Sequence, residues 1–146
     1  MAQHIREDGS VYHIVEHNPD TGEIIGYRAG QGYSTDSAWS RGQAWALYGF
    51  AMLHRKSEDK LFLEQAEKCA EYILSHLPED GIPNWDFDST DELKDSSAAA
   101  IMASASTTSS LTLTLFSSMN HPPFLIFSFY FKLKQMLQVS AAFVNN

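Results

Sequence analysis

Two short runs of β-prone residues open the chain, at residues 11–15 and 23–27. Between them lie Asn18, Pro19 and Gly22, which are residues typical of tight turns. Branched and aromatic residues bounded by turn residues are the usual signature of paired strands. We therefore expect a small β-hairpin over residues 11–27.

The spacing of apolar residues then changes from a strand period to a helix period. A first helix is predicted over residues 37–55, with Asp36 or Ser37 as its N-cap. Its apolar stripe follows the i, i+3, i+4, i+7 spacing and contains Trp45, Tyr48, Gly49 and Met52.

Residues 57–59, which end with Asp59, should break the first helix and cap a second, which is predicted over residues 59–77. One face is apolar and consists of Leu63, Ala66, Ala70, Ile73 and Leu77. The opposite, solvated face carries Glu64, Lys68 and Glu71. Two amphipathic helices joined by a few polar residues predict an antiparallel αα-hairpin, which needs further helices to cover its apolar faces.

Residues 78–81 contain proline and glycine and should end the second helix, and residues 83–88 should form an ordered loop. Residues 95–103 have the composition of the capped first turns of a third helix, with Asp95 at its start. From residue 104 the pattern changes to Ser/Thr/Leu low complexity. An uncharged aromatic run at 124–131 follows, which favours aggregation if exposed, unless it is a buried strand. We therefore divide the chain into residues 1–105 and an anomalous C-terminal tail, 106–146.

The distribution of charge restricts the ligands of this chain. All 18 acidic residues lie at or before Asp95, together with eight of the ten basic residues. An acidic segment without a basic patch argues against nucleic acid as a partner. One local arginine is nevertheless enough to bind a single carboxylate.

The sequence predicts neither a metal nor another cofactor. The six histidines have no cysteine or paired carboxylate at ligand spacing, and no glycine-rich phosphate loop is present. The single cysteine, Cys69, and the lack of a secretory h-region favour a cytoplasmic location. The apolar run at 124–131 is shorter than the roughly 20 residues that span a bilayer, so we expect no membrane segment.

Candidate chemistry is concentrated in residues 31–45, where two tryptophans alternate with glycines, glutamines and Arg41. Indole faces stack on sugar rings, and guanidinium and amide groups donate to carboxylates and hydroxyls. The segment therefore predicts the wall of a saccharide site. The alternative is an ordinary amphipathic helix start with Trp39 and Trp45 in the core.

Several unusual motifs occur in one order: Asp-Gly-Ser-Val-Tyr-His at 8–13, Gln-Gly-Tyr at 31–33, Arg-Gly-Gln-Ala-Trp at 41–45 and Trp-Asp-Phe-Asp at 85–88. In this order they resemble the unsaturated glucuronyl hydrolases of glycoside hydrolase family 88, over about residues 4–105. The resemblance implies an all-α fold, here a fragment of an (α/α)6 barrel of six helical hairpins. It also implies removal of a terminal Δ4,5-unsaturated uronic acid from oligosaccharides by hydration of the vinyl-ether double bond.

By the same resemblance, four residues would bind the substrate: His13, Gln31, Arg41 and Trp45. The family's catalytic aspartates lie upstream of the Asp-Gly-Ser segment, and no residue of this chain matches them. We interpret the chain as a middle piece of such a hydrolase, joined near residues 104–106 to an unrelated sequence. Uncovered apolar surface would then favour self-association.

Three functions stay open at this point. The first is hydrolysis, which requires the missing helices from another chain. The second is a noncatalytic remnant or sugar-binding fragment. The third is an unsaturated rhamnogalacturonyl hydrolase, whose corresponding segment tends to read Arg-Gly-Asn-Gly-Trp, so that Gln43-Ala44 favours the glucuronyl type. For individual residues, His13 can instead be structural, and Arg41 can pair with Asp36 or a nearby glutamate.

Overall fold

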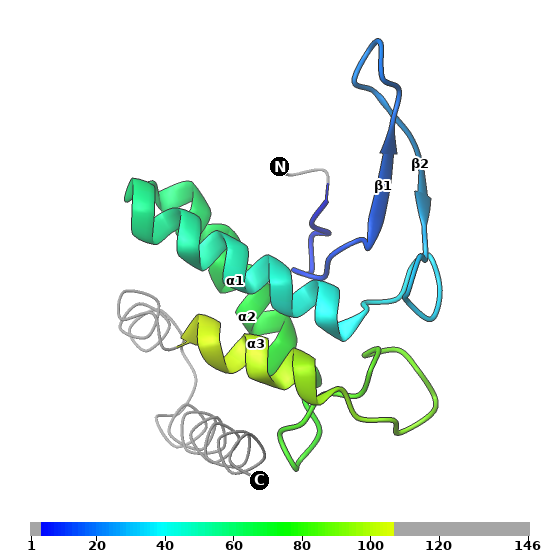
Figure 1. Ribbon diagram of the computed structural model, residues 1–146, viewed down its shortest axis with the longest axis vertical. Helices are drawn as coiled ribbons and strands as arrows, with labels where there is room; N and C mark the ends of the chain where they lie inside the picture. Colours follow the sequence, from blue (N-terminus) through cyan, green and yellow to red (C-terminus); the bar gives the residue numbers. More distant parts are fainter. Residues whose placement is uncertain (1–3, 107–146) are drawn as a thin grey trace, which may run out of the picture.

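Two strands and three helices make up residues 4–106, the part of the chain that the computed structural model describes (Figure 1). The elements are β1 (Ile14–His17), β2 (Ile24–Arg28), α1 (Ser40–Ser57), α2 (Lys60–His76) and α3 (Ser96–Ser106). The expected mainly helical fold with a small β-hairpin is therefore confirmed. The predictions for the tail, including the aromatic run at 124–131, lie outside the described residues.

The β-hairpin is antiparallel, with a bulge between Glu16 and His17. Its first strand begins three residues later than the pattern predicts. The reason is that Val11 and Tyr12 pair with the N-terminal segment instead: Val11 bridges Ile5, and the Tyr12 N–H donates to the His4 carbonyl. The turn forms as expected, because the Gly22 N–H donates to the Asn18 carbonyl at 2.8 Å.

Helices α1 and α2 form the predicted αα-hairpin. Glu58 ends α1 in the left-handed region at φ 59°, and the Asp59 side chain then caps α2 by accepting from the Leu61 N–H at 2.9 Å. Helix α1 also packs against α3, so that it contacts both other helices. The N-terminal ends of α1 and α3 lie at the same end of the helical unit, where the loops before them gather (Figure 1).

The core between the helices is built largely from small side chains. Four alanines are fully buried: Ala44, Ala66, Ala98 and Ala105. Leu47 packs in the same core and is one of its largest fully buried side chains. Small residues let helix axes approach closely, so that three helices can pack with few large side chains. None of the helices in residues 4–106 is long and apolar enough to cross a membrane.

The apolar stripe predicted for α1 is wrong. The buried residues of α1 are Ser40, Gln43, Ala44, Leu47 and Ala51, whereas Trp45 is 53% exposed. The sequence pattern predicted burial of large residues, but α1 contacts two neighbouring helices, and this close packing buries mainly its smaller residues. In α2 the prediction holds better, since Ala66, Ala70 and Ile73 are buried, although Cys69 and Tyr72 are buried too. Burial raises the pKa of the Cys69 thiol to about 12, so the side chain acts as a small apolar residue.

The predicted side-chain cap of α1 is wrong as well. Trp39 occupies the N-cap position, and it makes no side-chain capping hydrogen bond. A distant loop satisfies the first turn instead: the Ser40 N–H donates to the Trp85 carbonyl at 3.1 Å, and the Ser40 hydroxyl donates to the Asn84 carbonyl. Asp95 does cap α3 as predicted, because its Oδ1 accepts from the Ala98 N–H at 2.9 Å.

Candidate substrate-binding site

His13 lies against the loop that follows β2. The Gln31 N–H donates to His13 Nδ1 at 2.8 Å, and the Ala29 carbonyl oxygen lies 2.9 Å from the same nitrogen. The amide N–H can only donate and the carbonyl oxygen can only accept, so Nδ1 satisfies one of these two contacts in either neutral tautomer, and both hold the ring against the loop. Gly30 makes the close approach feasible, because it adopts φ +58° and a Cβ there would lie 2.2 Å from His13 Nδ1.

Trp39 joins His13 to Arg41. The His13 and Trp39 ring centroids are 4.4 Å apart, and Arg41 Cζ lies 5.2 Å from the centroid of the same indole. Gly42 leaves room for this arrangement, since a Cβ at that position would meet Trp39 Cε3 at 3.0 Å. A guanidinium at this distance from an indole face is stabilised by about 0.5–1 kcal/mol at an exposed site. The Trp39 indole therefore lies between His13 and Arg41, two of the predicted site residues, and contacts both.

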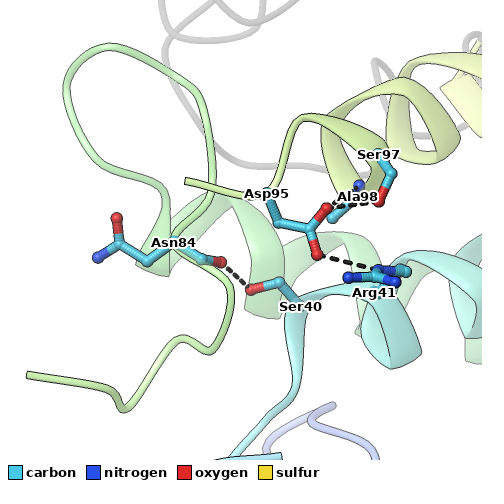
Figure 2. Close-up of polar contacts among 6 residues, drawn as sticks. All are labelled: Ser40, Arg41, Asn84, Asp95, Ser97 and Ala98. Carbon is cyan, nitrogen blue, oxygen red and sulfur yellow. Dashed lines mark hydrogen bonds and ion pairs between the residues drawn. The ribbon is translucent and has the colours of Figure 1, made fainter. Parts of the chain in front are cut away.

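Arg41 is held by Asp95 at the start of α3, as Figure 2 shows. Arg41 Nε lies 3.0 Å from Asp95 Oδ2, and the carboxylate is buried while the arginine side chain is 42% exposed. Burial by itself raises the pKa of Asp95. Hydrogen bonds from Ser97, Ala98 and Arg41, with the Arg41 charge, outweigh it and leave the pKa below its ordinary value. The predicted alternative of an arginine ion pair is thus correct in kind, but the partner is Asp95 and not Asp36 or a nearby glutamate.

Trp45 lies one helical turn after Arg41, so both project from the same side of α1. Its ring is half-exposed and meets Tyr48 edge-on, with centroids 5.8 Å apart and planes at 85°. The alternative of Trp45 as a core residue is therefore wrong. An exposed indole steadied by a second ring can offer a face to a ligand.

Asp86 fixes the loop that carries this polar segment. It is fully buried, and its Oδ2 accepts from the Tyr33 N–H and the Ser37 hydroxyl, both at 2.9 Å. Its Oδ1 accepts from the Asp88 N–H at 3.0 Å. The donors are two backbone N–H groups and one serine hydroxyl. Through them, Asp86 ties residues 33–37 to the loop before α3. Asp86 therefore has an architectural role.

Sequence relatives of the chain carry consistent names. An unsaturated glucuronyl hydrolase of Formosa agariphila is 38% identical over 110 residues, which is 72% of this chain and 28% of the relative. An unsaturated chondroitin disaccharide hydrolase of Streptococcus pyogenes is 39% identical over 100 residues, or 66% of this chain and 25% of the relative. No protein-family model matches the chain.

Solved structures agree with these relatives. A crystal structure of an unsaturated glucuronyl hydrolase specific for heparin superposes with a TM-score of 0.75 and 35% identity, covering 93% of this chain and 35% of that one. The unsaturated glucuronyl hydrolase of a Bacillus species gives a TM-score of 0.73 at 33% identity, covering 92% and 35%. This chain belongs to the unsaturated glucuronyl hydrolase family. It spans about a third of the solved relatives' length or less.

Within this family member, the structure brings three of the four predicted residues together. His13 touches the Gln31 backbone, and Trp39 connects His13 to Arg41, whereas Trp45 lies a turn further along α1. The Gln31 side chain is exposed, and only its backbone N–H is engaged with His13.

Sequence reasoning missed the roles of Trp39, Asp86 and Asp95 at this site. The sequence identified Trp39 only as one of two tryptophans in residues 31–45. Its contacts with His13 and Arg41 depend on its position at the N-cap of α1. Asp86 and Asp95 bond to residues more than 45 positions away along the chain. The only local signal was the pairing of Asp95 with a helix start, which identified the cap but not the contact with Arg41.

Proposed function

We propose that residues 4–106 form part of the substrate-binding wall of an unsaturated glucuronyl hydrolase, in a fragment of a six-hairpin (α/α) barrel. The proposed reaction of the whole enzyme is removal of a terminal Δ4,5-unsaturated uronic acid from an oligosaccharide by hydration of its vinyl-ether bond. One observation carries the proposal: the Trp39 indole contacts both His13 and Arg41, and the exposed Trp45 follows one helical turn after Arg41.

Each group in this wall has a chemistry that suits a uronate. Arg41 uses Nε on Asp95, so its two terminal nitrogens would bind the uronate carboxylate. The Trp45 face would stack on the sugar ring, and the Gln31 amide would donate to a hydroxyl. His13 would position a water or hydroxyl through Nε2, because the loop contacts use Nδ1.

The ligand class is supported by a relative. A mutant unsaturated glucuronyl hydrolase of Streptococcus agalactiae is known in complex with dGlcA-GalNAc6S, and this chain matches that structure with a TM-score of 0.65 at 29% identity. The match covers 92% of this chain and 35% of the other. We therefore infer an unsaturated uronic-acid disaccharide as the smallest ligand to test.

We further propose that this polypeptide binds such a ligand without converting it. The hydration reaction needs a carboxyl group that donates a proton and accepts one from water. Asp86 and Asp95, the two buried carboxylates beside the wall, each accept three hydrogen bonds within the protein. Neither is placed to exchange protons with a ligand, so the wall is a binding surface in this chain.

Ligand titration tests the proposal. The purified chain is titrated with an unsaturated glucuronyl disaccharide, and binding is followed by the ligand's saturation-transfer NMR signal. Trp45→Ala should weaken binding at least tenfold, on the scale of about 1.4 kcal/mol per factor of ten. Leu53→Ala is the matched control, because Leu53 is similarly exposed, at 45%, further along α1. Equal effects of the two substitutions would place the ligand elsewhere.

The rhamnogalacturonyl alternative is tested in the same titration. Gln43 is buried and its Nε2 donates to the Gly9 carbonyl at 2.8 Å, so it belongs to the packing behind the wall. The Arg-Gly-Gln-Ala-Trp form of the segment favours the glucuronyl ligand. Tighter binding of an unsaturated rhamnogalacturonyl disaccharide would reverse this assignment.

A further inference from the structure

The two oxygens of Asp95 serve two different elements. Oδ1 accepts from the Ala98 N–H at 2.9 Å and from the Ser97 hydroxyl, and thereby caps α3. Oδ2 accepts from Arg41 Nε at 3.0 Å, across 54 residues of sequence (Figure 2). The Asp95 N–H itself donates to the Pro83 carbonyl at 2.9 Å. The carboxylate is therefore fixed by α3 and the guanidinium, and the Asp95 backbone is fixed by the loop at Pro83.

This anchoring determines which edge of the guanidinium faces a ligand. A guanidinium presents one bidentate edge made of Nε and one Nη, and a second made of both Nη groups. Asp95 occupies the first edge through Nε, and Trp39 lies across one face of the group. The edge made of both Nη groups is the one that remains for a planar carboxylate. The exposed part of the side chain is consistent with this, since Arg41 is 42% exposed while Asp95 is 5% exposed.

The ion pair also changes what the arginine can bind. An unpaired arginine attracts any anion through its net charge, whereas Asp95 compensates much of that charge. Recognition then depends on two parallel hydrogen bonds to a carboxylate held in the plane of the group.

We propose that Asp95 is a positioning residue, which orients Arg41 so that its outer edge selects the carboxylate of the unsaturated uronate. This inference rests on the proposed function. It goes beyond it by naming the residue that sets carboxylate recognition. The competing view is that Asp95 only caps α3, and the two views predict different behaviour for two conservative variants.

Asp95→Asn separates the two roles of the carboxylate. Asparagine is as good an N-cap as aspartate, so Oδ1 still accepts from Ala98 and α3 keeps its start. Its amide nitrogen, in the place of Oδ2, faces another donor at Arg41 Nε and releases the guanidinium. Ser97→Ala is the matched control, because it removes a hydrogen bond to Oδ1 and leaves the contact of Oδ2 with Arg41 intact.

The experiment measures the full chain in two ways. The first is affinity for an unsaturated disaccharide and for its carboxyl methyl ester. Arg41 is 42% exposed, so solvent and salt screen the charge that Asp95→Asn uncovers. The loss of orientation should therefore dominate and reduce the preference for the free acid about tenfold, the scale of one charge-assisted hydrogen bond. Ser97→Ala should preserve the preference. In an Arg41→Lys background, Asp95→Asn should have no further effect on it.

The second measurement is the hydrogen exchange of the Arg41 Nε–H by NMR, without any ligand. Exchange should be slow in the wild type and in Ser97→Ala, and at least tenfold faster in Asp95→Asn. Unchanged Nε–H exchange in Asp95→Asn overturns the proposal, as does an unchanged preference for the free acid. Failure of the wild type to bind either disaccharide refutes the proposed function instead, and the exchange measurement still decides whether Asp95 positions Arg41.

Discussion

The helical core and the polar wall of this protein are held together by opposite means. In the core, alanines such as Ala44, Ala66 and Ala98 are buried because they are small and let three helices approach. Beside the wall, Asp86 and Asp95 are buried because each accepts three hydrogen bonds, and at least one of the three comes from a distant segment. The core therefore depends on volume, whereas the wall depends on the direction of donors and acceptors.

This difference predicts different failures. A change of volume in the core should lower the free energy of unfolding of the whole described unit. Loss of an acceptor in the wall should release a loop and change ligand binding, with a smaller effect on the helices.

The largest effect on stability should come from Leu47→Ala. Leu47 is 1% exposed between the helices, and loss of a buried leucine typically lowers the free energy of unfolding by about 2–5 kcal/mol through lost burial and a cavity. Chemical denaturation measures this, with Leu53→Ala as the exposed control on the same helix. A similar loss in both variants would contradict the assignment of the core to the small-residue face of α1.

Asp86→Ala should have the next largest effect. It leaves the Tyr33 and Asp88 N–H groups and the Ser37 hydroxyl without their acceptor, at a cost of about 1–3 kcal/mol for such a group left unsatisfied. Hydrogen exchange should accelerate at the Tyr33 amide, while amides in the middle of α2 keep most of their protection. Uniform acceleration throughout residues 4–106 would show that the loop and the helices are one cooperative unit.

The wall should also be sensitive to acid. Because the folded protein lowers the pKa of Asp95, this group contributes stability above its unfolded pKa, and the contribution is lost as the pH falls through the folded pKa. The stability difference between wild type and Asp95→Asn should therefore shrink on acidification. Denaturation curves over a pH series measure it, and a difference that grows towards low pH would contradict the lowered pKa.

Trp45→Ala should have the smallest effect on stability, within about 0.5 kcal/mol, because the ring is half-exposed. The same substitution should weaken ligand binding strongly. Thermal unfolding of this variant, compared with its titration, separates the two properties. A large loss of stability would mean that the indole serves the fold.

The sequence was sufficient for elements whose signals are local. The turn residues between the strands and the Asp59 and Asp95 caps predicted the hairpin and the starts of α2 and α3, because each signal acts within a few residues. Prediction from the sequence failed where hydrogen-bond partners are distant along the chain. The first turn of α1 is satisfied by Asn84 and Trp85, more than 40 residues away, and no local pattern encodes that contact.

The site shows the same limit. Residue type predicted a saccharide wall at Arg41 and Trp45, but it left open an ordinary helix start with the tryptophan in the core and the arginine in an ion pair. The identity of the arginine's partner required the fold, because Asp95 is brought to it only by the packing of α3 on α1.

The central claim is that this chain holds a binding wall for an unsaturated uronate without a carboxyl group that can perform the hydration. The most direct test is incubation of the purified, single-species polypeptide with an unsaturated glucuronyl disaccharide, followed by absorbance of the conjugated double bond. We predict saturable binding and no loss of absorbance beyond that of a blank without protein. Loss of absorbance at an enzymatic rate, abolished by Arg41→Ala, would contradict the claim.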